Sequence, residues 1–220
     1  MKESFYDFKA KDIRGNEVSM NDFKDKVIVE PSGKNTAPAI GMMASYFALE
    51  DPDSIMGVFP ADHLIVGHQK YEKAISTAYH LANKGENLVT IGIKPNYAST
   101  AYGYIQYDEN NKIESREIFH VKAFAEKPHL KLAERFIESG DFLWNSGMFF
   151  WKVDTFLNSM KLHMPELLNE VEKIAYRIKK GDSFNDLWEF IKPESIDYGL
   201  LEKANNIYVV PADFQWNDIG

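Results

Sequence analysis

Hydrophobic residues along this chain fall into two alternating kinds of segment. Continuous apolar runs, typical of strands buried on both faces, lie at residues 55–59, 88–93 and 207–210. Apolar residues recur at helical spacing over residues 36–50 and about 69–84. This alternation of strand and helix predicts an α/β fold with parallel strands.

From residue 102 onward the pattern indicates antiparallel strands. Two strands are predicted over residues 102–107 and 113–125, joined by a turn at the polar residues 108–111. A helix over 130–139 is followed by a strand over 143–151, and helical spacing continues over 154–180 with a break at Pro165. Residues 5–29 form a short β-rich opening in this scheme.

The composition excludes several classes of function. Lys and Arg number 25 against 33 Asp and Glu, and the net charge of −8 argues against binding to nucleic acid or anionic membranes. Because the chain has no cysteine, disulfides, Cys-based zinc sites and thiol nucleophiles are excluded. The sequence contains no apolar leader and no run long enough to cross a membrane, so we expect a soluble cytoplasmic protein.

Two aspartates follow predicted strands and are candidates for metal binding. Asp62 comes just after the strand at 55–59, and Asp218 comes after the strand at 207–210. Ligands of open α/β sheets bind beyond the carboxyl ends of the strands, where two carboxylates can share one Mg²⁺ ion. The alternative is that Asp62 only caps the next turn or helix.

Two polar motifs interrupt predicted strands. Glu126-Lys127-Pro128 ends one strand, where Glu126 could bind a hydroxyl-rich ligand and Lys127 a phosphate; the alternative is a solvated surface pair. Asn145-Ser146-Gly147 lies inside an apolar strand, which indicates either a ligand close to the backbone or a β-bulge. The general signatures GxGxxG, Walker A, GxSxG and HExxH are all absent.

Seven segments, taken in order, resemble the mannose-1-phosphate guanylyltransferase family of nucleotide-sugar pyrophosphorylases. They are residues 29–40, Pro60-Ala61-Asp62-His63, Tyr102-Gly103-Tyr104-Ile105, Glu126-Lys127-Pro128, residues 143–149, Ser195-Ile196-Asp197-Tyr198 and Trp216-Asn217-Asp218-Ile219-Gly220. The chain departs from the family at Lys34, where Arg is usual, at Ala101, where Gly is common, and at Asn217, where Ser is frequent. The resemblance covers about residues 28–220 and implies a Rossmann-like nucleotidyltransferase mixed sheet with an antiparallel sugar-binding extension.

The resemblance also implies a reaction and a set of site residues. GTP and mannose 1-phosphate would give GDP-mannose and pyrophosphate, with Mg²⁺ bridging the phosphates. Asp62 and Asp218 would hold the metal, and Lys127 would contact the sugar phosphate. The remaining substrate-binding residues are Glu126 and Asn145 at the mannose hydroxyls, Gly103 and Tyr104 at the sugar-side wall, and Glu30, Gly33, Asn35 and Thr36 near guanine and ribose.

The sequence differs from this family at its start. The family's glycine-rich loop, GGxGTRxxP, is absent, and residues 4–28 instead resemble the opening hairpin of a glutathione peroxidase. Peroxidase chemistry is excluded because the chain has no cysteine. We therefore predict a foreign or divergent β segment at residues 1–28 and an incomplete nucleotidyltransferase-like domain at 29–220, truncated at both ends.

The absent loop leads to two expectations about activity and assembly. Without its backbone donors and cations, we expect little or no guanylyltransferase turnover from this chain alone. The alternative function is a non-catalytic sugar-phosphate-binding or assembly remnant of the same fold. We also expect low stability, or a homodimer that covers the unpaired part of the sheet.

Overall fold

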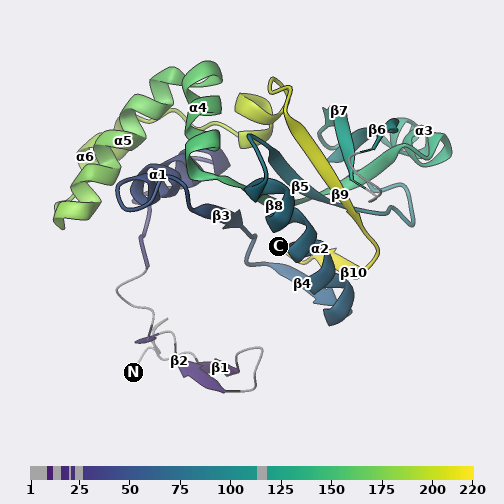
Figure 1. The fold of residues 1–220 in the computed structure, drawn as a ribbon, viewed down its shortest axis with the longest axis horizontal. Helices are drawn as coiled ribbons and strands as arrows, with labels where there is room; N and C mark the ends of the chain where they lie inside the picture. Colours follow the sequence, from purple (N-terminus) through teal and green to yellow (C-terminus); the bar gives the residue numbers. More distant parts are fainter. Residues whose placement is uncertain (1–8, 12–15, 20, 23–26, 113–117) are drawn as a thin grey trace. The chain divides into compact units, whose positions relative to one another are not determined.

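The computed structural model describes residues 9–11, 16–19, 21–22, 27–112 and 118–220, and divides the chain into two compact units (Figure 1). The first unit is Met1–Gly33, in which β1 (Lys9–Lys11) pairs antiparallel with β2 (Glu17–Ser19). This pairing agrees with the predicted β-rich opening, whose turn falls outside the described residues. That residues 1–28 form a foreign or divergent segment stays a prediction.

The second unit, Lys34–Gly220, is built on a six-stranded mixed sheet, which confirms the predicted α/β fold. Its strand order is β3 (Ile55–Val58), β8 (Phe142–Lys152), β5 (Leu88–Ile93), β9 (Ile207–Ala212), β7 (Phe119–Ala125) and β6 (Tyr104–Lys112). Among the described strands only β5 and β9 pair in parallel. The three strands predicted to be parallel, β3, β5 and β9, do run in the same direction, but β8 lies between β3 and β5 and is antiparallel to both.

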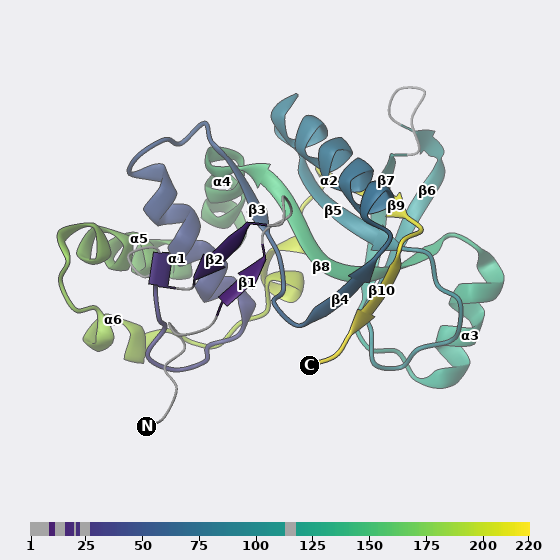
Figure 2. The same cartoon turned by 90° about the horizontal axis from the view of Figure 1, so that it is seen from below.

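Six α-helices and one π-helical turn of the described chain surround this sheet. They are α1 (Thr36–Ala48), α2 (His68–Asn83), α3 (Leu130–Ser139), α4 (Val153–His163), α5 (Pro165–Lys180), α6 (Asn185–Phe190) and the turn η3 (Asp197–Leu201). Figures 1 and 2 show α1, α4 and α5 gathered near β3, whereas α3 lies at the opposite end of this unit. The break predicted at Pro165 is confirmed, because proline begins α5 at a position where its missing N–H needs no partner.

The core explains which strand predictions succeed. All six residues of β5 are buried, as its continuous apolar run predicts. The similar run at 55–59 is less buried than predicted: β3 lies at the edge of the sheet, and only Met56 among its four residues is buried. Phe59, directly after β3, is 46% exposed. An apolar run alone therefore does not distinguish a central strand from an edge strand.

One further prediction is wrong in detail, and one small sheet was not predicted at all. The polar residues 108–111 belong to β6 rather than to a turn, and residues 113–117 lie outside the described part of the chain. A second sheet was not predicted: β4 (His63–Val66) pairs antiparallel with β10 (Gln215–Asp218). Within the described residues, no helix combines the length and apolar character that crossing a membrane requires.

Candidate active site

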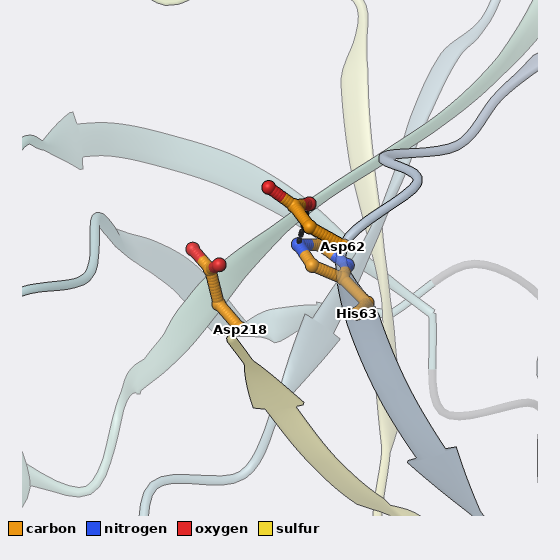
Figure 3. Close-up of side chains that lie close together, drawn as sticks. All are labelled: Asp62, His63 and Asp218. Carbon is orange, nitrogen blue, oxygen red and sulfur yellow. Dashed lines mark ion pairs between the residues drawn. The ribbon is translucent and has the colours of Figure 1, made fainter. Parts of the chain in front are cut away.

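The β4–β10 pair brings together Asp62, His63 and Asp218 (Figure 3). In its register Asp218 lies opposite His63, and the backbone N–H of Ile219 donates to the carbonyl of Asp62 at 3.0 Å. One potential ligand atom from each of the three side chains lies within 4.8 Å of the others. The two carboxylates therefore have the predicted proximity, although their role as metal ligands stays a prediction.

The donor atoms of this cluster fit a hard cation. Asp62 is 56% exposed and Asp218 is also exposed, so both carboxylates can accept a hydrated ion without prior desolvation. Mg²⁺ prefers oxygen ligands and usually keeps several waters, and one or two carboxylates are its usual protein ligands. The residues present therefore suit Mg²⁺ through Asp62 and Asp218.

His63 is the buried member of the cluster. Its side chain is 7% exposed, and its Nδ1 accepts a hydrogen bond from the indole Nε1 of Trp216 at 3.0 Å. Its Nε2 lies 3.9 Å from Oδ1 of Asp62. Burial lowers the pKa of His63, and the charges of Asp218 and Asp62 oppose this shift.

A second cluster forms where β7, β6 and β8 meet, around Gly103. The backbone N–H of Asn145 donates to the carbonyl of Gly103 at 2.8 Å. A Cβ atom added at Gly103 would lie only 2.6 Å from Oε2 of Glu126 and 3.4 Å from Cβ of Asn145. The absence of a side chain at Gly103 therefore lets the Glu126 carboxylate lie against the backbone, and a larger residue would displace it.

Asn145 lies at an irregularity of β8. Thr90 pairs with Phe149 but Gly92 pairs with Asn145, so β8 contains two more residues than β5 over this interval. Gly147, inside the interval, has a φ of 67°. This register shift agrees with the β-bulge alternative, and it lies next to Asn145, which still pairs with Gly92.

The side-chain amide of Asn145 is fixed at both ends. Its Oδ1 accepts from the backbone N–H of Gly147 at 3.1 Å, and its Nδ2 donates to Oδ1 of Asp197 at 2.9 Å. The other carboxylate oxygen of Asp197 accepts from the hydroxyl of Ser195 at 2.9 Å. One amide hydrogen and one lone pair of Asn145 remain for a ligand.

Glu126 and Lys127 form a partly exposed acid–base pair at the end of β7. Lys127 Nζ lies 3.8 Å from Oε1 of Glu126, and the Lys127 backbone has a φ of 43°, which is uncommon outside glycine and concentrated at functional sites. Burial raises the pKa of Glu126, the charge of Asp197 adds to this rise, and Lys127 opposes it.

Tyr102 connects the two clusters. Its hydroxyl donates to Oδ1 of Asn217, next to Asp218, at 2.9 Å, and it precedes Gly103 in the chain. Its ring packs edge-on against Trp144 and Trp216, with centroids 5.1 and 4.8 Å away. Burial and the neighbouring Tyr97 raise the pKa of Tyr102 to about 12, so it stays a hydrogen-bond donor.

Comparison with known proteins identifies the family. Residues 6–220 match the family model described as nucleotidyl transferase. The chain belongs to this family. The match begins within the segment 1–28 that the sequence analysis set apart, and the domain boundary proposed there stays a prediction.

Curated relatives show which members of the family the chain is similar to. The chain is 36% identical over 208 residues to a mannose-1-phosphate guanylyltransferase of Escherichia coli, covering 91% of this chain and 45% of the relative. It is 34% identical over 198 residues to the xanthan biosynthesis protein XanB of Xanthomonas campestris, covering 88% of this chain and 41% of that protein. The predicted resemblance is confirmed, and the chain spans somewhat less than half the length of these relatives.

Solved structures agree with the fold. A Thermus thermophilus structure titled mannose-1-phosphate geranyltransferase superposes with a TM-score of 0.74 at 30% identity, covering 87% of this chain and 54% of that one. A Helicobacter pylori structure titled mannose-6-phosphate isomerase has the same TM-score at 31% identity, covering 90% and 79%. A UDP-glucose pyrophosphorylase, 14% identical with a TM-score of 0.51, shares the fold.

The other residues selected from the nucleotidyl transferase sequence have different surroundings. Tyr104 is fully buried, and its hydroxyl both accepts from and donates to the backbone of Ser99, so its side chain belongs to the core. Asn35 caps α1, and Thr36 Oγ1 accepts from the backbone N–H of Ile196 at 2.9 Å. Glu30 and Gly33 belong to the first unit and are described separately from this site.

Sequence analysis missed the role of several residues that shape the site. Asp197 and Trp216 fall inside the quoted motifs, but only the structure shows that they hold Asn145 and His63. The signal that could have found Asp197 is its position as an acid between Ile196 and Tyr198. Nothing in the local sequence pairs it with Asn145.

Proposed function

We propose that this chain carries the sugar-phosphate and metal-binding part of a mannose-1-phosphate guanylyltransferase. Such an enzyme converts mannose 1-phosphate and GTP into GDP-mannose and pyrophosphate. The observation that carries the proposal is the link from the Asp62–Asp218 pair, through Tyr102 and Gly103, to Glu126 and Asn145. The names of the curated relatives support the same reaction.

The reaction is a phosphoryl-group substitution that needs positioning and charge neutralisation. An oxygen of the sugar phosphate forms a bond to the α-phosphorus of GTP, and the bond from that phosphorus to the pyrophosphate oxygen breaks. Mg²⁺ held by Asp62 and Asp218 would neutralise charge on the phosphates. No covalent intermediate with the protein is required.

The chain's own residues orient the sugar phosphate. Glu126 accepts hydrogen bonds from mannose hydroxyls, and the free amide hydrogen of Asn145 donates to a hydroxyl oxygen. Lys127, whose ammonium group is largely exposed at the edge of this cluster, binds the phosphate through charge-assisted hydrogen bonds. These contacts hold the attacking oxygen in place, which lowers the entropic part of the barrier.

The proposal is tested first by binding. Mannose 1-phosphate and GTP are titrated separately into the protein by calorimetry with Mg²⁺, and glucose 1-phosphate serves as the control sugar. We expect mannose 1-phosphate to bind more tightly than glucose 1-phosphate, because the two differ in the orientation of one hydroxyl and the proposed role of Glu126 and Asn145 is to bind the sugar hydroxyls. If neither sugar phosphate binds, the proposed site is wrong.

Turnover is tested by pyrophosphate release. The 220-residue protein is compared with a version in which a family segment containing GGxGTRxxP replaces residues 1–28. We expect turnover mainly from the second protein, because a triphosphate requires preorganised backbone donors and fixed cations. Robust turnover from the unmodified 220-residue protein would show that residues 4–28 already provide a nucleotide-binding loop.

Three further attributes stay predictions. The net charge of −8 supports small phosphorylated ligands, bound through local cations and metal, over nucleic acid or membrane partners. A cytoplasmic location and a homodimer are expectations from the sequence. The alternative, a non-catalytic sugar-phosphate-binding remnant, would bind mannose 1-phosphate but not GTP in the same titrations, even with the grafted segment.

A further inference from the structure

His63 has the geometry of a metal ligand but not the available lone pair. Its ring nitrogen lies within 4.8 Å of the carboxylate oxygens of Asp62 and Asp218, which makes it a third candidate ligand by distance. However, an indole nitrogen can only donate a hydrogen bond. The bond from Trp216 Nε1 to Nδ1 of His63, 3.0 Å long, therefore requires that Nδ1 carry no proton.

This bond also settles which nitrogen is protonated. A neutral imidazole carries one N–H, so Nε2 holds the proton when Nδ1 accepts from the indole. Neither nitrogen then has a free lone pair, because Nδ1 uses its own on Trp216 and Nε2 is bonded to hydrogen. His63 can therefore donate toward the cluster but cannot coordinate a cation within it.

The Nε2–H group faces the Asp62 carboxylate. Nε2 lies 3.9 Å from Oδ1, longer than a hydrogen bond, and Asp62 is 56% exposed. A shift of about 1 Å in this exposed side chain would bring the two atoms to hydrogen-bond distance. The buried imidazole is thus placed to restrict the orientation of this exposed carboxylate.

The indole that orients His63 is itself held in place. The rings of Trp216 and His63 meet edge to face, with centroids 5.1 Å apart and an angle of 84° between their planes. On its other side Trp216 contacts Tyr102, at a centroid distance of 4.8 Å. Strand pairing adds a further constraint, because Trp216 lies opposite Ile65 in the β4–β10 register.

From this arrangement we propose that Trp216 and His63 form a donor relay that positions the Asp62 carboxylate for a divalent cation, and that His63 is not a ligand. This inference rests on the proposed metal site of Asp62 and Asp218. Histidine and carboxylate partners behind metal ligands commonly change metal affinity by about 10- to 100-fold when removed. His63 is accordingly a positioning residue.

The first test needs no metal. Long-range ¹H–¹⁵N correlation spectra of protein labelled at histidine nitrogens report which ring nitrogen of His63 carries the proton. We expect protonated Nε2 and unprotonated Nδ1 in the wild-type protein, and a mixture of both tautomers in Trp216→Phe, which keeps a ring but loses the indole donor. Protonated Nδ1 in the wild-type protein would overturn the proposal.

The second test uses Mn²⁺ alone, which substitutes for Mg²⁺ and is detected by electron paramagnetic resonance. We expect His63→Phe to bind Mn²⁺ about 10- to 100-fold more weakly than wild type and His63→Gln, which retains an N–H donor, to recover most of that loss. The matched control is His68→Phe, because His68 faces Glu72 at 3.2 Å on the exposed surface of α2 and should leave affinity unchanged.

Electron spin echo modulation distinguishes the remaining outcomes. A bound imidazole nitrogen couples directly to Mn²⁺, so we expect no such ¹⁴N coupling in wild type beyond the level of His63→Gln. A coupling lost only in the His63 variants would overturn the relay while leaving the metal site and the proposed function intact. If wild-type protein and Asp62→Asn show equally weak Mn²⁺ binding, the metal site itself fails, and the relay fails with it.

Discussion

The side-chain amide of Asn145 donates a 2.9 Å hydrogen bond to Asp197, which lies 52 positions further along the chain. This bond connects the irregular part of β8 to the turn η3 and leaves one amide hydrogen of Asn145 available to a ligand. The orientation of the amide therefore depends on a residue that need not contact the sugar.

Replacing Asp197 with Ala should weaken mannose 1-phosphate binding by about tenfold. The reason is that a charge-assisted hydrogen bond is worth roughly 1.5–3 kcal/mol and the freed amide would rotate among several orientations. Calorimetry measures the change, with Asp213→Ala as a control because Asp213 pairs with Lys70 on the surface. Unchanged affinity would show that Asn145 is oriented without Asp197.

Replacing Gly103 with Ala should displace the Glu126 carboxylate. The added Cβ would lie 2.6 Å from Oε2, closer than real Cβ contacts allow, so the acid must move away from the sugar site. We expect at least a tenfold loss of mannose 1-phosphate affinity, because one misplaced hydrogen bond to a charged group has about this effect. Gly85→Ala is the control, since its nearest neighbour is a side-chain atom of Asn87 at 3.4 Å.

Replacing Lys127 with Ala should affect the affinity for mannose 1-phosphate much more than the affinity for free mannose. Binding of mannose 1-phosphate should fall about 10- to 100-fold, whereas binding of free mannose should change little, because the lost contact is to phosphate. Lys122→Ala is the control, because Lys122 lies on the preceding strand β7 and pairs with Asp108 at 3.5 Å. An equal fall in both affinities would mean that Lys127 maintains the backbone or Glu126 instead.

Glu126 should make folding stability depend on pH. Its pKa is raised in the folded protein, chiefly by burial and then by the charge of Asp197, so the ionised acid is disfavoured there. The folded state binds the proton more strongly than the unfolded state, and stability falls as pH rises from 4.5 through the raised pKa. The Glu126→Gln variant has no carboxyl group at this position and should not lose stability in this way as the pH rises.

The measurement is the urea midpoint of both proteins at about pH 4 and about pH 7. We expect Glu126→Gln to be the more stable protein at the higher pH and to show a much smaller advantage at the lower pH. A difference independent of pH would indicate that the substitution changes packing and not ionisation. Mannose 1-phosphate binding should weaken in the same variant, because the carboxylate is lost as an acceptor.

The sequence predicted those elements whose signal is local. The continuous apolar run of β5 and the helix α3, which ends at the left-handed Gly140, match their predictions closely. By contrast, β4 and β10 are four residues each, and Leu64 and Val66 of β4 are more than half exposed. Strands this short and exposed are stabilised mainly by pairing with each other, so the hydrophobic pattern of the sequence does not predict them.

The candidate site shows the same division. Asp62 and Asp218 were selected as acids after strands, and the structure brings them together, but through the β4–β10 pair and not directly at the ends of β3 and β9. The roles of Asp197 and Trp216 depend on single contacts between distant segments. Contacts of this kind are set by the tertiary fold and leave no pattern in the adjacent sequence.

The short β4–β10 pair has a thermodynamic consequence. Its four paired positions hold Asp62 and Asp218 together although they come from distant parts of the chain, and a cation shared by them would close that long loop. If the cation binds only when β4 and β10 are paired, the fraction of molecules in which this pair is open falls as metal occupancy rises. Amide hydrogen exchange at Leu64 and Val66, whose N–H groups face β10 in this register, should therefore slow as Mg²⁺ is added, while exchange in the central strand β5 stays constant.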